Sequence, residues 1–592
     1  MVWDRKIKTR LIILSIILVG LLSSCSSQSL GKLWLKSEGW SRGTLLGETS
    51  LAAPAASAID SSGKVYTVLF PKTEPGSNLY QPILITMAET GEIGDQISLD
   101  FQTSQPKQSK IILSEEGIDL FWIDSYQLKS SKFSQEGELL SEVRVLSGEE
   151  IVSNFEVMLY DSDYEIWYAG TRDDPGLYAL SGKLDNLQKS LIDSLGTKVD
   201  LVMDSEEQIH ISWVHYPKNY GEIKFYYLKA EIGLIHPDQA KIIYKKSVSP
   251  SKRIDGPVIG IDQEVIYYIW SDSIISGLEA GMRTTYYQYF PIGFPDSIRP
   301  PMRMSVPAVQ DLDETDFISS TFETGDRILI GGMIPSTASL QNVEIISGQS
   351  NEIAVVYRSR TEFKWRDFRN QVNVAYLSDG LITTYQPLSY TSAESYYPMV
   401  FQDQENDLYV TWSEKGESAF RVYLTTTDLE KKLFLDQVSF NDYLYLSAEG
   451  LFGILAGAVL APFAAAVWGG AGIVAFLINS ILSRFNHQFY RSLGEFLSIL
   501  VAIFIFWVIK FATLPGLKDG YVPFSGWIPR IPPTWETLLV LGVPIFIGLI
   551  SLILAWVKTY GKESGSPINF YLIYAAMDTL LSCAVYGILI YG

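Results

Sequence analysis

Apolar and polar positions follow two different patterns along this chain of 592 residues. Between residues 30 and 445, apolar and polar residues alternate over short runs that often end in Tyr or Trp, which is typical of half-buried β-strands. From residue 446 onward, long apolar blocks replace this alternation. A chain of this length is too long for one core. The change of pattern therefore predicts an all-β domain over 30–445 and a helical domain over 446–592.

The β region contains a repeated sequence pattern. An apolar strand leads into a turn that contains Asp, a second apolar strand ends in an aromatic residue, and a third segment follows. The clearest copy joins residues 398–403, which end at Asp403, to residues 407–412, which end at Trp412. The pattern occurs seven times. The other six copies join 55–60 to 65–70, 111–115 to 118–122, 157–161 to 164–168, 201–204 to 208–213, 258–262 to 265–270, and 343–346 to 353–357.

Seven units of about 50 residues, each with three or four short strands, are typical of a β-propeller. One such blade cannot bury both of its faces, whereas blades stacked around an axis bury them against each other. We expect Asp to shape the turn and the terminal aromatic residue to pack between blades. A β-sandwich array and a solenoid are the alternatives, and the single period favours the propeller. Residues 273–304, rich in Gly, Pro and Met, interrupt the period and are interpreted as a loop insertion.

Four apolar blocks in the helical region are each long enough to cross a bilayer. They cover residues 451–482, 496–514, 538–557 and 570–591. The first block is longer than one span needs and contains Pro462 and the pair Gly469 and Gly470. It is therefore expected to be tilted, kinked, or broken into a span and a re-entrant piece.

Loop charge predicts the orientation of these spans. The loop with Arg484 and Arg491 and the loop with Lys558 and Lys562 are basic, so both are expected in the cytoplasm. The loop of residues 518–535 then faces outside, on the same side as the β domain. This count also places the C-terminus outside.

Two ionisable residues lie within the apolar blocks, where such residues are functional candidates. Asp578 is near the middle of the last block, and Lys510 is near the outer end of the second. Lys510 is expected to snorkel to the surface, and Asp578 to remain protonated inside the bundle. Because the region shows no internal repeat of the kind found in transporters, we interpret it as an anchor or a docking surface.

The N-terminus has the pattern of a secretory signal. A basic start is followed by the apolar residues 11–22 and then by Leu22-Ser23-Ser24-Cys25. This sequence resembles a bacterial lipobox, which implies lipidation of Cys25 and removal of the residues before it. The alternative is an uncleaved signal anchor. Both interpretations place residue 30 onward outside the cytoplasm.

Charge and cysteine content limit the classes of function. The net charge is −20, and because residues 1–25 and 446–592 are both net basic, the β domain is more acidic than the whole chain. Such a surface repels phosphate backbones, so nucleic acid is excluded as a partner, whereas cations or basic partners remain open. With only two cysteines, Cys25 and Cys583, the β domain has neither a disulfide nor a thiolate metal site.

The β domain has a family resemblance along most of its length, which is clearest in one stretch. From Asp204 to Tyr227 the sequence reads Asp, turn, apolar-His-apolar-x-Trp, and then apolar-x-Tyr-Tyr. It resembles the repeats of sialidase-like propellers, whose short repeated element is called the Asp-box, and this implies the propeller fold. The full Ser-x-Asp-x-Gly-x-Thr-Trp element is absent, and the Arg-Ile-Pro at 530–532 lies between membrane blocks.

The sialidase activity would need three arginines around a carboxylate, and a Tyr/Glu pair as nucleophile. The spacing selects no three among the available arginines, which are Arg172, Arg283, Arg358, Arg366 and Arg369.

Other residue types suggest no catalytic, cofactor or metal set. His210 and His215 fall on opposite faces of one strand, so a shared metal is not expected. An acidic group lacks the Gly and Glu positions of a calcium loop; its members are Asp161, Asp163, Asp173 and Asp174.

Three hypotheses for function follow. The first is a protein of the bacterial cytoplasmic membrane whose outward-facing propeller binds a glycan or a protein at its mouth without catalysis. The second is a sialidase-like, glycan-processing hydrolase. The third is an accessory subunit whose helices dock on a membrane transport or secretion complex. In all three, membrane lipid surrounds the helical domain.

Overall fold

The structure is a computed structural model that describes residues 39–591, except 218–220, 248, 279, 305–339, 347–351, 365–366, 390, 392, 417, 483–487, 515–521, 524–532 and 561–565. Its contacts divide the chain into two compact units, one that extends to Gln437 and one that begins at Val438. Cys25 and the Arg-Ile-Pro at 530–532 lie outside the described residues.

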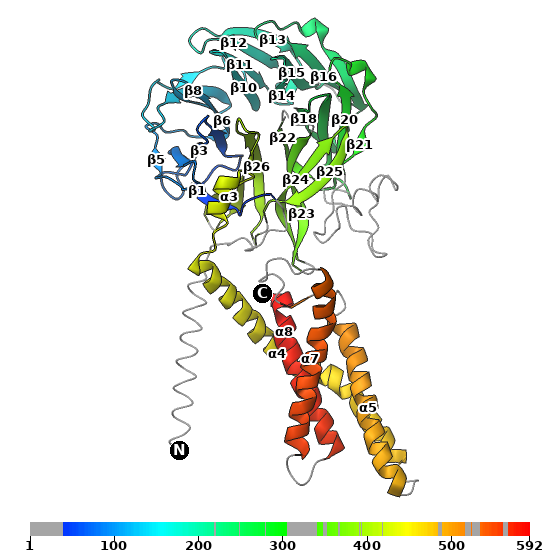
Figure 1. Cartoon of the computed structure of the whole chain (residues 1–592). Coiled ribbons are helices and arrows are strands. Elements are labelled where there is room, and N and C mark those ends of the chain that lie inside the picture. Colours follow the sequence, from blue (N-terminus) through cyan, green and yellow to red (C-terminus); the bar gives the residue numbers. More distant parts are fainter. Residues whose placement is uncertain are drawn as a thin grey trace. The chain divides into compact units, whose positions relative to one another are not determined.

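The first unit is a seven-bladed β-propeller, as the repeat predicts. Its strands form seven four-stranded antiparallel sheets, which follow one another around the ring in Figure 1. Blades 1 to 3 consist of β2 (Ala56–Ile59), β3 (Val65–Leu69), β4 (Ile83–Met87) and β5 (Ile97–Ser98); β6 (Pro106–Ser114), β7 (Gly117–Asp124), β8 (Gln127–Phe133) and β9 (Arg144–Val145); and β10 (Asn154–Tyr160), β11 (Asp163–Ala169), β12 (Leu177–Gly182) and β13 (Gln188–Asp193).

Blades 4 to 6 continue the same order along the chain. They consist of β14 (Gly196–Met203), β15 (Ile209–His215), β16 (Glu222–Ala230) and β17 (Lys241–Ser247); β18 (Lys252–Ile261), β19 (Val265–Ile274), β20 (Arg283–Pro291) and β21 (Met302–Arg303); and β22 (Gln341–Ile346), β23 (Ile353–Lys364), β24 (Asp367–Ser378) and β25 (Leu381–Pro387). The interpretation of residues 273–304 as a loop insertion is wrong, because they contain β20 and β21, the outer half of blade 5.

Blade 7 closes the ring by joining the two ends of the propeller sequence. It combines β26 (Ser395–Gln402), β27 (Leu408–Lys415) and β28 (Phe420–Thr426) with β1 (Thr44–Thr49), which pairs antiparallel with β28. Side chains on the innermost strands also bond to neighbouring blades. Asn154 accepts from the backbone N of Val199 at 2.8 Å, and Asp200 accepts from the backbone N of Ile259 at 2.8 Å.

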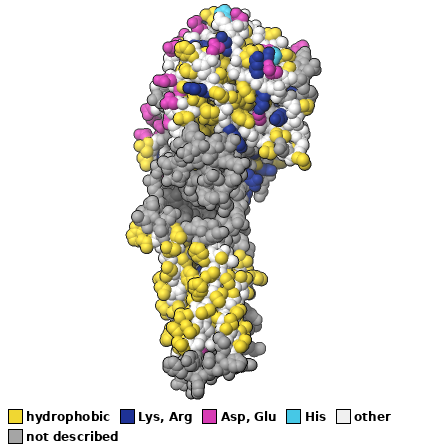
Figure 2. All heavy atoms as spheres, turned by 90° about the vertical axis from the view of Figure 1, so that its right-hand side faces the viewer, with side chains coloured by type: hydrophobic (Ala, Val, Ile, Leu, Met, Phe, Trp, Pro, Cys, Tyr) yellow, Lys and Arg dark blue, Asp and Glu magenta, His cyan; other side chains and the backbone are white. Residues whose placement is uncertain are grey.

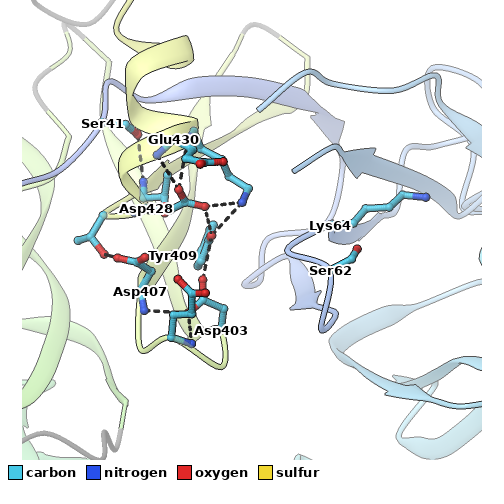
Figure 3. Close-up of polar contacts among 12 residues, drawn as sticks. Ser41, Ser62, Lys64, Asp403, Asp407, Tyr409, Asp428 and Glu430 are labelled. Atoms are coloured by element: carbon cyan, nitrogen blue, oxygen red, sulfur yellow. Dashed lines mark hydrogen bonds and ion pairs between the residues drawn. The ribbon is translucent and has the colours of Figure 1, made fainter. Parts of the chain in front are cut away.

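Among the described residues, the expected Asp turn joins the first and second strands in four blades. In blade 7 the Oδ1 atom of Asp403 accepts from the backbone N atoms of Glu405 and Asp407, both at 2.9 Å, and its Oδ2 accepts from the Tyr409 hydroxyl at 3.2 Å (Figure 3). Asp60, Asp204 and Asp262 repeat the arrangement, with a Tyr or His side chain on Oδ2 each time. This carboxylate therefore shapes the turn and fastens it to the second strand.

The aromatic residue that ends the second strand packs between blades, as expected. Trp270 of blade 5 is 1% exposed and contacts Phe225 and Tyr244 of blade 4, with ring centroids 5.3 and 4.9 Å apart. Trp412 of blade 7 is buried in one cluster with Ala354 and other residues of blade 6. Each of these blade interfaces therefore has its own aromatic core.

The ring has two distinct faces. We call the face with the first-to-second strand turns the turn face, and the face where the innermost strands begin the start face. The chain leaves the propeller at the turn face through α3 (Leu429–Leu435), whose N-cap is Asp428. Asp436, which follows α3, accepts from the backbone N of Arg42 at 2.7 Å, so entry and exit lie together.

The described part of the second unit contains four long apolar helices. They are α4 (Phe440–Leu482), α5 (Gln488–Thr513), α7 (Pro533–Tyr560) and α8 (Pro567–Tyr591). Each contains a stretch long and apolar enough to cross a membrane. Figure 2 shows that the visible side of these helices carries mainly hydrophobic side chains, whereas charged ones lie mainly on the propeller. The predicted fold class is therefore confirmed.

Candidate functional site

A cluster of basic side chains surrounds one carboxylate on the start face of blades 4 and 5. Asp255, near the beginning of β18, contacts Lys198 of β14 at 3.2 Å and Arg253 of its own strand at 3.1 Å. Arg283, at the beginning of β20, contacts the other carboxylate oxygen at 2.7 Å. We call these four residues the Asp255 cluster. It contains three cations and one anion, so it carries a net positive charge.

The titration behaviour of the Asp255 cluster reflects this excess. Burial alone would raise the pKa of Asp255, but Lys198, Arg283 and Arg253 outweigh it and hold that pKa below its usual value. Burial and the two neighbouring arginines lower the pKa of Lys198. The carboxylate thus stays ionised, and the cations around it repel one another.

Arg358 of β23 adds a further cation on the neighbouring blade. Its guanidinium carbon lies 4.4 Å from the ring centroid of Tyr396, which belongs to β26 of blade 7. Its Nε atom is buried and has no hydrogen-bond partner among the described residues. Burial lowers the pKa of Arg358 and Arg283 acts in the same direction, whereas Tyr396 and the Glu394 carboxylate oppose the shift. A half-buried cation whose buried donor is unfilled favours an anion beside it.

A second charged group lies at the axis of the ring, on the innermost strands. Lys110 of β6 forms an ion pair with Glu156 of β10, and their side chains are 28% and 12% exposed. Asp200 of β14 and Glu344 of β22 act electrostatically on the same pair. We call these four residues the axial cluster. It brings together three carboxyl groups and one amine from four blades.

Burial determines how the axial cluster titrates. Burial first, and the nearby Glu156 second, raise the pKa of Asp200 to about 7. Burial likewise raises the pKa of Glu344 to about 8, although Lys110 opposes this shift. Asp200 also accepts a backbone hydrogen bond from Leu201 at 3.0 Å. Near neutral pH, Asp200 and Glu344 therefore hold protons that free carboxyl groups would lose.

The two strand histidines have separate structural partners. His210, which is fully buried, bonds through Nε2 to Asp204 and through Nδ1 to the Tyr227 hydroxyl, both at 2.8 Å. His215 bonds through Nδ1 to Asp193 at 2.9 Å. The two side chains thus point to different partners, in agreement with the predicted opposite faces. His210 completes the Asp turn of blade 4.

The acidic residues considered for calcium do not assemble into a site in the described part of the chain. No group of three or more His, Cys, Asp or Glu residues there could hold a metal ion. Asp163 begins β11, and Asp173 and Asp174 follow β11. Asp161 lies in the turn before that strand, with φ of +54°.

The two charged residues of the membrane blocks form one buried pair. Lys510 Nζ of α5 lies 2.5 Å from the Asp578 carboxylate of α8, and both side chains are 0% exposed. Ser582 donates to the same carboxylate oxygen at 3.3 Å, and the Lys510 ammonium lies 4.5 Å from the Trp507 ring. The expectation that Lys510 snorkels and Asp578 stands alone is therefore wrong. Pairing removes two isolated charges from the bundle.

Sequence reasoning named several arginines, and the structure separates them. Arg283 and Arg358 lie on the start face, whereas Arg172 lies 5.1 Å from the ring of Tyr216. Arg369 belongs to β24, and Arg366 is outside the described side chains. Sequence reasoning missed Lys198 and Arg253. Their position near the beginning of an innermost strand was the signal that could have found them.

Comparison with known proteins gives distant likenesses. No family model and no curated protein matches the chain. Among solved structures, a polysaccharide lyase described as an ulvan lyase is 10% identical, with 69% of this chain and 100% of that chain covered and a TM-score of 0.41. An α-L-arabinanase of Penicillium chrysogenum is 12% identical, with 65% and 98% covered and a TM-score of 0.31. A subtype N10 neuraminidase-like protein of A/little yellow-shouldered bat/Guatemala/060/2010 is 10% identical, with 54% and 94% covered and a TM-score of 0.31.

Proposed function

We propose that this membrane protein is a recognition protein whose propeller binds an anionic ligand on the start face of blades 4 to 6. The observation that carries the proposal is Arg358, a half-buried cation whose buried Nε donor has no partner among the described residues. The Tyr396 ring beside it offers a flat apolar surface. A guanidinium with an unfilled donor suits carboxylate, sulfate or phosphate oxygens.

The Asp255 cluster supports the same ligand chemistry. Its surplus of positive charge lies close enough to act on Arg358, since Arg283 influences the pKa of Arg358. Lys198, Arg253 and Arg283 contact one carboxylate, Asp255, and the carboxylate that acts on Arg358 is Glu394. An acidic protein with this local basic surface attracts anions to one place. Glycans with acidic groups and acidic peptides both fit this chemistry.

Recognition without hydrolysis fits the carboxyl groups better than glycosidase chemistry. A glycosidase of the common type places two carboxyl groups on either side of the bond that it cleaves. Asp255 is already held by three cations. In the axial cluster, Glu156 is paired with Lys110, and Asp200 accepts two backbone hydrogen bonds. Asp255, Glu156 and Asp200 are therefore already engaged with cations or backbone donors.

The location that we propose is the bacterial cytoplasmic membrane, with the propeller outside. The basic loops around Arg484 and Lys558 support this orientation through the positive-inside rule. Lipidation of Cys25 would add a second anchor to the four helices. Both the orientation and the lipidation are inferred from the sequence.

A binding screen with the full chain in mild detergent tests the proposed function. The chain is applied to an array that contains neutral glycans, carboxylated and sulfated glycans, and acidic and neutral peptides. We expect signals on anionic members only, and we expect Arg358→Gln to reduce them at least tenfold. Arg144→Gln, on the outer strand of blade 2, is the matched control because its exposed guanidinium pairs with Asp185, away from the start face. Binding to neutral members that survives Arg358→Gln would contradict the proposal.

A further inference from the structure

The cations of the start face extend beyond the Asp255 cluster, because a further arginine continues them onto blade 3. Arg172 follows β11, and its guanidinium carbon lies 5.1 Å from the ring centroid of Tyr216 in blade 4. The backbone of Ile254 in blade 5 bonds to the Tyr216 hydroxyl. Arg172, Arg253 and Asp255 all act electrostatically on this hydroxyl. Arg172 and the Asp255 cluster therefore belong to one continuous charged surface.

The same surface continues from blade 5 to blade 6, because Arg283 acts on Arg358. We call the five cations the basic arc, and in order along the chain they are Arg172, Lys198, Arg253, Arg283 and Arg358. Asp255 and Glu394 bring negative charge to blades 5 to 7, and Asp173 and Asp174 follow Arg172 on blade 3. The surplus of positive charge is therefore centred on blades 4 to 6, and Arg172 marks one end of the arc.

Three aromatic side chains continue the arc on blade 7. The ring of Tyr396, beside Arg358, has its centroid 5.9 Å from that of Tyr397 and 6.2 Å from that of Phe420. All three rings are half-buried, and none of them belongs to a hydrophobic cluster of the described propeller residues. We call these three residues the aromatic platform. It offers apolar ring faces directly beside a cation.

The backbone holds the aromatic platform in an unusual conformation. Tyr397 has a φ of +51°, in the left-handed region that L-residues other than Asn and Asp seldom adopt. Between Tyr396 and Met399, a β-bulge shifts the register of β26 against β27. Bulges re-aim side chains at the ends of strands, and local strain of this kind concentrates at ligand sites. The bulge therefore directs these rings away from the core of blade 7.

We propose that the basic arc and the aromatic platform together bind an acidic polysaccharide, a chain that carries a carboxylate or sulfate on successive sugars. The inference rests on the proposed function and specifies its ligand. One sugar packs its apolar C–H face on the aromatic platform, and Arg358 binds an acidic group beside it. The cations of blades 5, 4 and 3 then bind acidic groups farther along the chain. All residues of both surfaces are among the described ones.

The spread of the basic arc favours a chain over a ligand with one acidic group. Its members come from four consecutive blades, and a single carboxylate or sulfate cannot contact cations on all of them. A chain with repeated acidic groups can do so, and each contact after the first is intramolecular, which raises the affinity. Asp255 already holds three of the cations in place, so little side-chain entropy is lost when the chain binds.

The aromatic platform favours a saccharide over an acidic peptide. A sugar ring presents a rigid apolar face that can lie flat on Tyr396 and its neighbours. The carboxylates of a peptide stand on flexible aliphatic stems, which must be ordered at a cost in conformational entropy. A peptide of equal charge therefore gains from the basic arc but little from the aromatic platform.

Titration of the full chain in mild detergent with a length series of one acidic sugar tests the inference. The ligands are galacturonate and its linear oligomers of up to about eight sugars, their neutral methyl esters, and oligoglutamates of equal length. We expect the longest oligogalacturonate to bind at least about tenfold more tightly than galacturonate, and its methyl ester not to bind. The oligoglutamate should bind at least about tenfold more weakly than the oligogalacturonate of equal length. High ionic strength should reduce the gain with length.

Two variants divide the contributions of the arc and the platform. Arg172→Gln should weaken the longest oligogalacturonate at least about threefold and leave galacturonate unchanged, whereas its control Arg144→Gln, outside the arc, should change neither. Tyr397→Asn removes a ring while Asn tolerates the left-handed backbone, so it should weaken oligogalacturonates of every length. Tyr126→Asn is its matched control, because Tyr126 has a φ of +66° and lies between β7 and β8 of blade 2. All four variants should keep the melting temperature of the wild type.

The length series separates failure of this inference from failure of the proposed function. Galacturonate and the longest oligomer that bind equally, both through Arg358, would overturn the extended site and leave anion recognition intact. Oligoglutamates that bind as tightly as oligogalacturonates would overturn the assignment to a polysaccharide. A wild-type protein that binds neither these ligands nor any anionic array member would contradict both.

Discussion

At the scale of single residues, the surroundings of a carboxyl group decide whether it stabilises the folded propeller in its charged or its neutral form. In the blade 4 turn, burial opposes ionisation of Asp204, but His210 and the backbone donors outweigh it and lower its pKa. At the axis, burial dominates and raises the pKa of Glu344. The Asp204 carboxylate therefore acts as an anion, whereas the axial carboxyl group of Glu344 favours the protonated form.

Removing the turn carboxylate of blade 4 should destabilise the propeller. Asp204→Ala deletes the acceptor for the backbone N atoms of Glu206 and Gln208 and leaves the fully buried His210 without its partner on Nε2. We expect a loss of about 2–4 kcal/mol in the free energy of unfolding, because a buried polar group is then left unsatisfied. Urea unfolding followed by tryptophan fluorescence measures it. Glu206→Ala, in the same turn but with a 79% exposed side chain, should change it little.

The axial cluster should make stability fall with rising pH between about 4.3 and about 8. The pKa of Glu344 is raised to about 8 in the folded protein and is about 4.3 in an unfolded chain. The folded state therefore keeps a proton that the unfolded state has lost, and stability falls as pH rises through about 8. Glu344→Gln should raise the melting temperature by about 2–4 °C at about pH 9 and leave it unchanged at about pH 4.5. An equal effect at both pH values would show that its charge is not the cause.

At the scale of elements, small residues allow the helices of the membrane unit to approach closely. Helix α4 continues through Pro462 and the Gly469–Gly470 pair without a break, so those glycines do not mark a re-entrant piece. A Cβ on Gly457 would lie 1.8 Å from the backbone O of Cys583 in α8. Tyr571 of α8 donates to the backbone O of Gly469 at 2.9 Å. Glycine therefore serves packing between helices here.

A pair of glycine substitutions tests this contact. Gly457→Val should force α4 and α8 apart and lower the apparent melting temperature in detergent by about 5 °C or more, because the close backbone contact is lost. Gly470→Val is the matched control, since a Cβ added to Gly470 would meet no atom within 4 Å. Size-exclusion chromatography after a heating series measures both. If Gly470→Val were the more damaging variant, the close approach of α4 and α8 at Gly457 would be incorrect.

The elements that the sequence predicts well are those defined by local patterns. The Asp turn needs only residues within about six positions of Asp403, so its repeat located the blades. The Lys510–Asp578 pair joins residues 68 positions apart on α5 and α8. Periodicity does not reveal which faces of two hydrophobic helices meet, so the sequence predicted two isolated charges there. Contacts between residues far apart in the sequence therefore could not be predicted from local patterns.

At the scale of the whole molecule, charge is distributed unevenly between and within the units. The chain carries a net charge of −20, yet the start face of blades 4 to 6 gathers Lys198, Arg253, Arg283 and Arg358. These four come from β14, β18, β20 and β23, so no single motif contains them. Only the ring, in which equivalent strand ends share a face, brings them together. The composition alone indicated an acidic surface and missed this local excess.

The orientation of the helical unit is testable by labelling. Compared with its Cys583→Ala parent, which retains Cys25, Ser525→Cys in the 518–535 loop should gain reaction with a membrane-impermeant maleimide in intact spheroplasts. Ser483→Cys and Ser564→Cys, in the two basic loops, should react only after permeabilisation, because positive loops stay inside. The reverse pattern would place the propeller in the cytoplasm.

The most direct test of anion recognition is a calorimetric titration of the strongest anionic array member into the full chain in detergent. The side-by-side titrations use wild type, Arg358→Lys and the control Arg144→Gln. A lysine keeps the charge but loses the planar guanidinium that stacks on Tyr396. If Arg358 binds the anion through its guanidinium, binding should be at least about tenfold weaker for Arg358→Lys and unchanged for Arg144→Gln. Equal affinity for all three proteins would contradict it.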